Sequence, residues 1–131
     1  MSTRTGHCLC GAVSFGIEGP LADVLHCHCE NCRRTTGNFI AASRVEFDDI
    51  VFIEASGLRW YDVEDYASYG FCCECGATIF FRAVDAPDRV SVCIGMLDSA
   101  EDLELGSVWF AGEAQPHNQL PGGVPHHTAN G

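Results

Sequence analysis

The chain has 131 residues, which suits a single domain, and nine of them are cysteine. Its 7 basic residues, all arginine, stand against 18 acidic ones, and the net charge of −11 disfavours nucleic acid and anionic membranes as partners. No apolar run reaches the roughly 20 residues of a membrane helix, and the first residues lack a secretory signal, so we expect one cytoplasmic domain over residues 1–131.

Alternation of apolar and polar residues dominates the chain and predicts strands. In chain order, the expected strands cover residues 12–18, 21–29, 39–47, 50–54, 58–63, 78–83, 89–96 and 107–111. The polar segment 30–37 ends in Gly37 and predicts a short helix of one or two turns. Residues 98–103 predict a further helical turn with an Asp or Ser cap, and residues from about 121 to 131 predict a loose tail. The predicted fold class is mostly β.

The cysteines fall into clusters that point to metal binding rather than to disulfides. An odd number of cysteines without a secretory signal argues against a closed disulfide framework. In a reducing compartment, clustered thiols are more often metal ligands or catalytic groups. Seven of the nine cysteines fit such a role.

Two pairs of cysteines, far apart in sequence, each have the spacing of half a zinc site. Cys8 and Cys10 present both sulfurs on one side of an extended segment. Cys72 and Cys75 have the spacing of a zinc knuckle, with Gly76 relieving the turn. Together they predict a closed structural zinc site with four thiolate ligands, which would tie the N-terminal segment to a distant part of the chain. The alternative is four buried thiols without metal.

The middle cluster differs because it offers only three thiols. Cys27, Cys29 and Cys32 lie within six residues, and no fourth cysteine is near in sequence. Three protein ligands and an open position are typical of a catalytic zinc. The alternative is a second structural zinc closed by a histidine or a carboxylate. The neighbouring His26 and His28 alternate with the cysteines and are expected to face away.

Three other features carry competing interpretations. Cys73 is expected to point away from the knuckle, and Cys93 is expected to be an ordinary buried thiol. Arg33 and Arg34 form the single adjacent basic pair in this acidic sequence. They are candidates either for binding a substrate carboxylate beside the open zinc or for a structural ion pair.

The cysteine motifs resemble those of the glutathione-dependent formaldehyde-activating enzyme family, which includes the centromere protein V group. The resembling segments are 6–13 (GHCLCGAV), 26–34 (HCHCENCRR) with Gly37, 70–77 (GFCCECGA) and 95–98 (GMLD). The resemblance covers about residues 6–112. It departs from the family at 114–118 (AQPHN), where members commonly have an aromatic residue after an Ala-Pro step.

This resemblance implies a β-tent of folded antiparallel sheets built around a structural zinc. Cys8, Cys10, Cys72 and Cys75 would match the structural ligands, and Cys27, Cys29 and Cys32 the ligands of a catalytic zinc. The implied activity is that of a carbon–sulfur lyase that joins glutathione or another small thiol to an aldehyde, as in S-hydroxymethylglutathione synthesis. The competing hypothesis is a zinc-stabilised β-tent binding module without catalysis.

Overall fold

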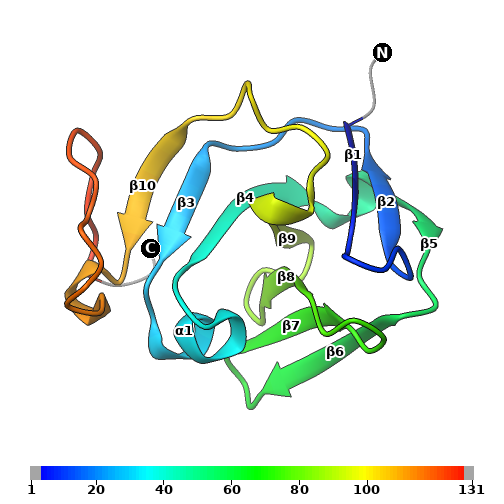
Figure 1. Cartoon of the computed structure of the whole chain (residues 1–131), viewed down its shortest axis with the longest axis horizontal. Coiled ribbons are helices and arrows are strands. Elements are labelled where there is room, and N and C mark those ends of the chain that lie inside the picture. Colours follow the sequence, from blue (N-terminus) through cyan, green and yellow to red (C-terminus); the bar gives the residue numbers. More distant parts are fainter. Residues whose placement is uncertain (1–3, 129–131) are drawn as a thin grey trace.

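The computed structural model describes residues 4–128 and is mostly β, as the sequence predicts (Figure 1). The ten strands are β1 (Arg4–His7), β2 (Ser14–Ile17), β3 (Val24–Cys27), β4 (Ile40–Glu46), β5 (Ile50–Glu54), β6 (Leu58–Val63), β7 (Ala67–Cys72), β8 (Thr78–Ala83), β9 (Arg89–Cys93) and β10 (Leu105–Trp109). The α-helix is α1 (Glu30–Thr36), and short 3₁₀ turns cover Phe47–Asp49, Ile94–Met96 and Ala111–Glu113. Within these residues, no helix has the length and apolar character needed to cross a bilayer.

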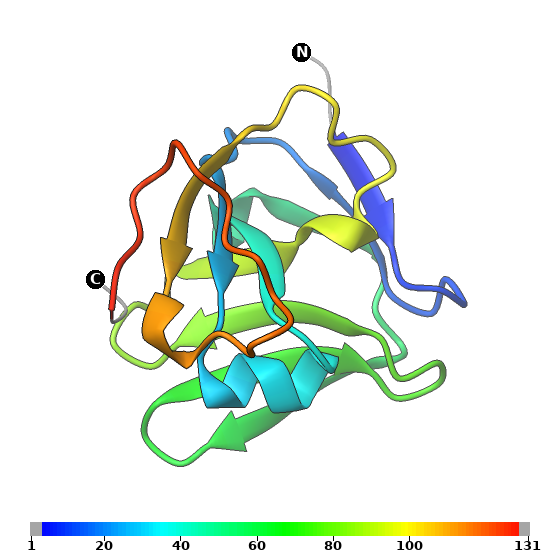
Figure 2. The same ribbon diagram turned by 60° about the vertical axis from the view of Figure 1, so that its left-hand side comes forward.

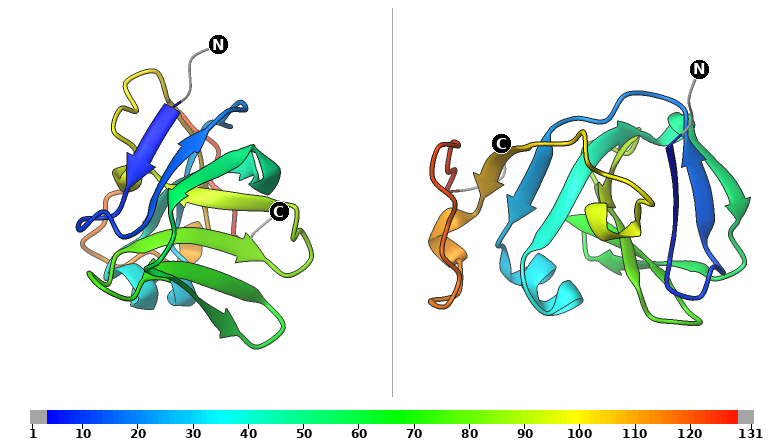
Figure 3. Two further views of the ribbon diagram at one scale, coloured as in Figure 1. Left: turned by 90° about the vertical axis from the view of Figure 1, so that its right-hand side faces the viewer. Right: turned by 45° about the horizontal axis from the view of Figure 1, so that its top comes forward.

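The strands form two sheets. The smaller sheet has the order β1-β2-β5 and the larger one the order β10-β3-β4-β9-β8-β7-β6. Neighbouring strands are antiparallel except β10 and β3, which run parallel. The exception arises because the long connection after β9 carries the chain along the top of the larger sheet before β10 begins (Figures 1 and 3).

Two apolar cores lie within this architecture. The first lies between the sheets and is built around Phe15 and Phe80, whose ring centroids are 5.4 Å apart. The second lies near α1, where Tyr69, Leu25 and Ile40 pack together. Buried cysteines belong to both cores, so each cysteine cluster is anchored in apolar surroundings.

The helix α1 forms where residues 30–37 predict it. Cys29 caps its N-terminus in an extended conformation, and its sulfur accepts a hydrogen bond from the Cys32 N–H. Gly37 ends the helix with φ 89°, a left-handed conformation that glycine adopts without strain, and its N–H donates to the Arg33 oxygen. Figure 2 shows α1 below the ends of β3 and β4, at one end of the larger sheet.

The prediction of a helical turn at residues 98–103 is wrong, because this segment contains no helical residues. This segment has a single hydrogen-bonded turn, in which the Leu103 N–H donates to the Ala100 oxygen. Its carboxylates are engaged with β1 instead of capping a helix: Asp98 accepts from the Thr5 hydroxyl, and Asp102 pairs with Arg4, both at 2.6 Å. Contacts with a distant strand therefore replace the local cap.

Two strands, β1 and β7, have no counterpart among the predicted strands. Both contain a glycine that interrupts the alternation, Gly6 in β1 and Gly70 in β7. A Cβ on Gly6 would lie 2.7 Å from the Met96 oxygen, which is too close, and a Cβ on Gly70 would make a tight contact of 3.1 Å with the rings of Phe80 and Trp60. Tertiary packing thus outweighs the weak local β signal.

The C-terminal segment, expected to be loose, follows the outer edge of β10 as far as the structure describes it (Figures 2 and 3). The His127 N–H donates to the Val108 oxygen at 2.8 Å, and the Val108 N–H donates to the Pro125 oxygen at 2.9 Å. The His127 ring stacks on Trp109 with centroids 3.9 Å apart. These contacts give hydrogen-bond partners to the backbone N–H and oxygen of Val108 at the edge of the larger sheet.

Candidate metal centres

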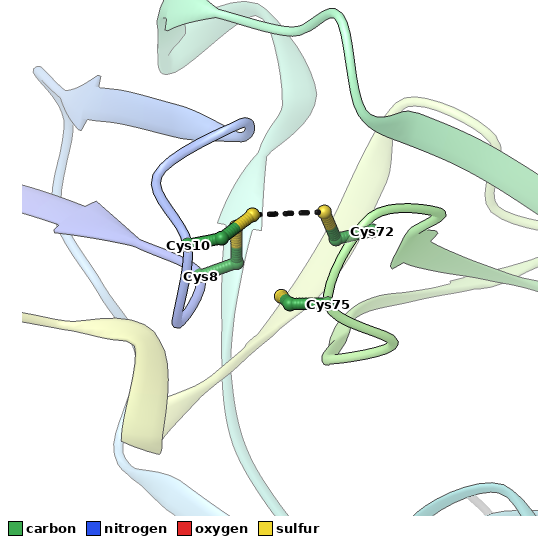
Figure 4. A group of neighbouring side chains, drawn as sticks. All are labelled: Cys8, Cys10, Cys72 and Cys75. Atoms are coloured by element: carbon green, nitrogen blue, oxygen red, sulfur yellow. Dashed lines mark hydrogen bonds between the residues drawn. The ribbon is translucent and has the colours of Figure 1, made fainter.

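Four cysteine sulfurs from two distant segments converge in the first cluster (Figure 4). The Sγ atoms of Cys8, Cys10, Cys72 and Cys75 all lie within 4.8 Å of one another. Cys10 Sγ is 3.8 Å from Cys8 Sγ and 3.7 Å from Cys72 Sγ. A regular tetrahedron with Zn–S bonds of about 2.3 Å has S···S edges of about 3.8 Å. The spacing therefore fits four thiolates around one zinc ion, and it is much longer than a disulfide bond.

Two loops with matching hydrogen bonds present these sulfurs. In the loop that follows β1, the Cys8 N–H donates to the Val13 oxygen at 3.0 Å. In the loop that begins at the last residue of β7, the Cys72 N–H donates to the Ala77 oxygen at 2.9 Å. Each loop is thus closed by its own backbone before any metal joins it to the other.

A glycine directly follows the last cysteine of each loop. Gly11 comes after Cys10 with φ 84°, and Gly76 comes after Cys75 with φ 81°. Residues with a Cβ rarely adopt this left-handed conformation, so the glycines allow the chain to turn back immediately after a ligand. The motif Cys-Gly is therefore a structural requirement of both halves of the site.

The turn between β5 and β6 holds the two loops together. The Gly57 N–H donates to the Ala12 oxygen at 3.0 Å, and the Gly57 oxygen accepts from the Cys73 N–H at 2.8 Å. A Cβ on Gly57 would lie 2.8 Å from the Cys72 sulfur and 2.9 Å from the Ala12 Cβ. Glycine at this position is what permits the close approach.

Backbone N–H groups stabilise thiolates in the first cluster. The Val13 N–H lies 3.4 Å from Cys8 Sγ, and the Ala12 N–H lies 3.5 Å from Cys10 Sγ. Hydrogen bonds from the backbone of Ala77 and then of Cys10 lower the pKa of Cys75 to about 6. Although the Ala12 N–H favours the thiolate of Cys10, the neighbouring thiols raise the pKa of Cys10 to about 12, so Cys75 is the more acidic of the two.

The second cluster is local and lies where β3 meets α1. Cys27 ends β3, Cys29 caps α1, and Cys32 lies in the first turn of that helix. Their Sγ atoms lie within 4.8 Å of one another, and among residues 4–128 no fourth cysteine, histidine or carboxylate joins the group. The hydroxyl of the buried Tyr69 lies 3.2 Å from Cys32 Sγ. The donor set fits a zinc ion with three thiolate ligands and one open position.

The three thiols influence one another's protonation strongly. Hydrogen bonds from Cys27 and Cys32 lower the pKa of Cys29 to about 2. In turn, Cys29 raises the pKa of Cys27 to about 12, and Cys27 and Cys29 raise the pKa of Cys32 above its usual range. Three thiolates so close together repel one another, and a divalent cation would stabilise all three.

A pocket of about 240 Å³ opens beside the second cluster. Cys27 and Cys32 form part of its wall, with Phe81 and Trp109 among the apolar residues. Its charged residues are Arg44, Arg89 and Asp85. The sulfurs are therefore next to a space large enough for a small molecule.

Comparison with known proteins agrees with the cysteine motifs. The profile of the family described as glutathione-dependent formaldehyde-activating enzyme matches residues 3–111, which contain both clusters. The chain belongs to this family. A crystal structure of a Rhodobacter sphaeroides protein is similar, with a TM-score of 0.63 and 25% sequence identity over 93% of this chain and 98% of that one. No curated protein compared with the chain matches it.

In this member of the glutathione-dependent formaldehyde-activating enzyme family, Arg33 and Arg34 do not line the pocket. They are the two arginines that the sequence made candidates for binding a substrate carboxylate. Arg34 pairs with Glu30 at 2.8 Å on the exposed face of α1, which is the ion-pair alternative. Sequence reasoning missed Arg44 and Arg89, which are isolated in the sequence and meet in space only through strand pairing.

The remaining candidates lie apart from the two clusters. Cys73 is exposed, and its sulfur lies 3.8 Å from a carboxylate oxygen of Glu74. Cys93 is buried, and burial raises the pKa of its thiol to about 12. His26 and His28 pack against Phe39, with ring centroids 4.4 Å and 4.9 Å from it. Neither histidine joins a group of candidate metal ligands among the described residues.

Proposed function

We propose that this chain is a zinc-dependent enzyme of the carbon–sulfur lyase type, which joins glutathione or another small thiol to an aldehyde such as formaldehyde. The observation that carries the proposal is the three-thiol cluster in the wall of a pocket, with no fourth side-chain ligand among residues 4–128. A closed site has no room for a substrate atom, whereas a zinc ion held by these three thiols would keep one position for a substrate atom from the pocket.

The proposed cofactors are two zinc ions with different roles. Cys8, Cys10, Cys72 and Cys75 would hold a structural ion that ties the smaller sheet to the end of β7. Cys27, Cys29 and Cys32 would hold the catalytic ion. Family membership supports the thiol and aldehyde as the reactants.

The proposed reaction is an addition in which all atoms are retained. The sulfur of the thiol substrate forms a bond with the carbonyl carbon, the C=O π bond opens, and the proton lost by the thiol ends on the carbonyl oxygen. A zinc ion at the open site would supply the thiolate, because a metal-bound thiol loses its proton at neutral pH.

The residues of the chain prepare this step. The Tyr69 hydroxyl, at 3.2 Å, orients Cys32, and the N-terminal turn of α1 fixes Cys29 and Cys32 relative to each other. Phe81 and Trp109 supply apolar surface to the wall of the pocket. Ligands that are held in a fixed position strengthen the electrostatic interactions on which such an addition depends.

Metal analysis combined with a rate measurement tests the proposal. We expect two zinc ions per chain, with X-ray absorption showing one bound by four sulfurs and one by three sulfurs and a lighter atom. Because thiols and formaldehyde also combine spontaneously, catalysis is measured by exchange NMR as acceleration of adduct formation with glutathione. The Cys32→Ser variant should lose the acceleration, and Cys73→Ser, at the exposed cysteine, should keep it.

The same data distinguish an enzyme from a zinc-stabilised binding module. A single zinc ion, or two ions each bound by four sulfurs, would leave no open position and would favour the module. Zinc-loaded protein that accelerates adduct formation with neither glutathione nor a smaller thiol would also contradict the proposed activity.

A further inference from the structure

The guanidinium groups of this chain differ in their partners. Four of the seven have evident structural roles: Arg4 pairs with Asp102, Arg34 pairs with Glu30, Arg59 donates to backbone carbonyls, and Arg82 lies over the rings of Phe47 and Trp60. Within residues 4–128, neither Arg44 nor Arg89 makes an ion pair. Both line the pocket beside the three thiols. Arg44 lies near the Trp109 ring, but in a chain with 18 acidic residues, two arginines without an ion pair in one wall require an explanation.

Strand register places the two guanidinium groups on one face. Arg44 in β4 is directly opposite Ser91 in β9, and Arg89 lies two residues before Ser91. Directly paired residues, and residues two apart on one strand, share a face of the sheet. All three residues accordingly line the pocket. Glu46, directly opposite Arg89 and two residues after Arg44, shares this face of the sheet; like Arg89 it is exposed, but it does not line the pocket.

The charged residues that line the pocket indicate which ligands it can bind. Among the residues that line the pocket, two arginines stand against one aspartate, Asp85, while Glu46 lies on the same face of the sheet outside the lining. A zinc ion with three thiolates would itself carry one net negative charge and would repel an anionic ligand. Positive charge elsewhere in the pocket compensates for that repulsion.

The geometry points to Arg44 and Arg89 as the groups that bind a carboxylate of the thiol substrate. This inference rests on the proposed function. Guanidinium groups bind carboxylates through paired charge-assisted hydrogen bonds. Trp109, whose ring centroid lies 5.8 Å from the Arg44 Cζ, and Phe81 would contact the hydrocarbon part of the ligand.

The size of the pocket limits which thiols can bind in it. Its volume of about 240 Å³ is slightly below the range of about 300–1,000 Å³ that is usual for ligand pockets. A compact ligand, or one end of a longer one, therefore fills it. The arginines of the wall favour a ligand with an anionic group over one with a large apolar substituent.

Binding of two thiols that differ in one group tests the inference. We would measure, by calorimetry on the zinc-loaded protein, the affinity for 3-mercaptopropionate and for its uncharged amide, 3-mercaptopropanamide. Arg44→Gln and Arg89→Gln should each weaken binding of the carboxylate about tenfold or more, because a charge-assisted hydrogen bond is lost. Both variants should leave binding of the amide within about twofold, which a general structural defect would not do.

Two controls complete the design. Arg59→Gln removes an arginine whose guanidinium bonds to the carbonyls of Ser56 and Leu58 outside the pocket, and should leave both affinities unchanged. The double variant Arg33→Gln, Arg34→Gln tests the pair singled out from the sequence. Zinc content and circular dichroism establish that each variant is folded.

The possible outcomes separate the two proposals. The inference would be overturned if the Arg44 and Arg89 variants weakened binding of both thiols equally, or if they weakened neither. It would also be overturned if the Arg33 and Arg34 double variant lost binding of the carboxylate alone. In each of these cases, thiol binding by the unaltered protein would leave the proposed function standing. Absence of binding of either thiol to the zinc-loaded, unaltered protein would overturn both.

Discussion

The two cysteine clusters use the same ligand type in opposite ways. The first draws its sulfurs from two loops more than 60 residues apart in the chain and lies against the core between the sheets. The second draws all three sulfurs from the junction of β3 and α1, and it borders a pocket. Metal at the first cluster would hold distant parts of the fold together, whereas metal at the second would add little to the fold and much to the chemistry. Two segments together supply four ligands, which would close the first site, whereas the single segment of the second site supplies three and would leave one position open.

The largest expected effect is at the first cluster. In Cys72→Ala, the site loses one of four ligands, and structural zinc contributes roughly 10–16 kcal/mol of apparent binding free energy in small zinc domains. We expect the variant to lose its cooperative unfolding transition, as measured by circular dichroism during heating. Cys73→Ala, one residue along and exposed, should change the free energy of unfolding by no more than about 0.5 kcal/mol. A stable, folded Cys72→Ala protein would contradict the structural role.

The second cluster should respond differently to the loss of a ligand. We expect Cys32→Ser to reduce the zinc content from two ions per chain to one and to abolish turnover, while the protein still unfolds cooperatively. The reason is that residues on one short segment need no metal to bring them together. Elemental analysis and denaturation of the same sample measure both effects. Unfolding as complete as that of Cys72→Ala would remove the distinction between the clusters.

A smaller effect is expected at the turn that joins the two loops of the first cluster. Gly57→Ala places a Cβ 2.8 Å from the Cys72 sulfur, so the loops must move apart. We expect a loss of about 1–3 kcal/mol in the free energy of unfolding, measured by urea denaturation. Gly95→Ala is the matched control, because a Cβ there meets no atom within 4 Å. Equal stability of the two variants would show that the turn does not constrain the site.

The smallest effect is expected at the hydroxyl beside the second cluster. Tyr69→Phe keeps the buried ring and removes the hydrogen bond to Cys32, at 3.2 Å. Partners of metal ligands typically change metal affinity by about tenfold or more, so we expect a loss of that size at the second zinc only. Chelator competition measures the affinity of each site. Tyr61→Phe, at an exposed tyrosine, should change neither site, and an equal loss at both sites in Tyr69→Phe would refute a local role.

Local spacing accounts for what the sequence predicted well. The extended pair Cys8 and Cys10, the knuckle pair Cys72 and Cys75, and the capped helix after Cys29 all depend on residues two to seven positions apart. Such geometry is nearly independent of the rest of the fold. The mostly β class follows from alternation, which is equally local.

Features that depend on contacts between residues far apart in the chain could not be predicted from local spacing. Strand β7 was missed, since its backbone is supported by β6 and β8 rather than by strong local preference. The segment 98–103 uses its carboxylates on β1 instead of forming a helix. In both cases the free energy of distant contacts exceeds a local propensity of about 1 kcal/mol or less.

The sequence by itself determined the family, the fold class and the grouping of the seven candidate ligands, because ligand spacing and alternation are written in neighbouring residues. Only the tertiary structure decided which arginines face the three thiols and which segment covers the edge of β10. Arg44 and Arg89 meet through the register of β4 and β9. That register is set by burial of apolar side chains across the whole domain, so no local pattern around either arginine reveals it.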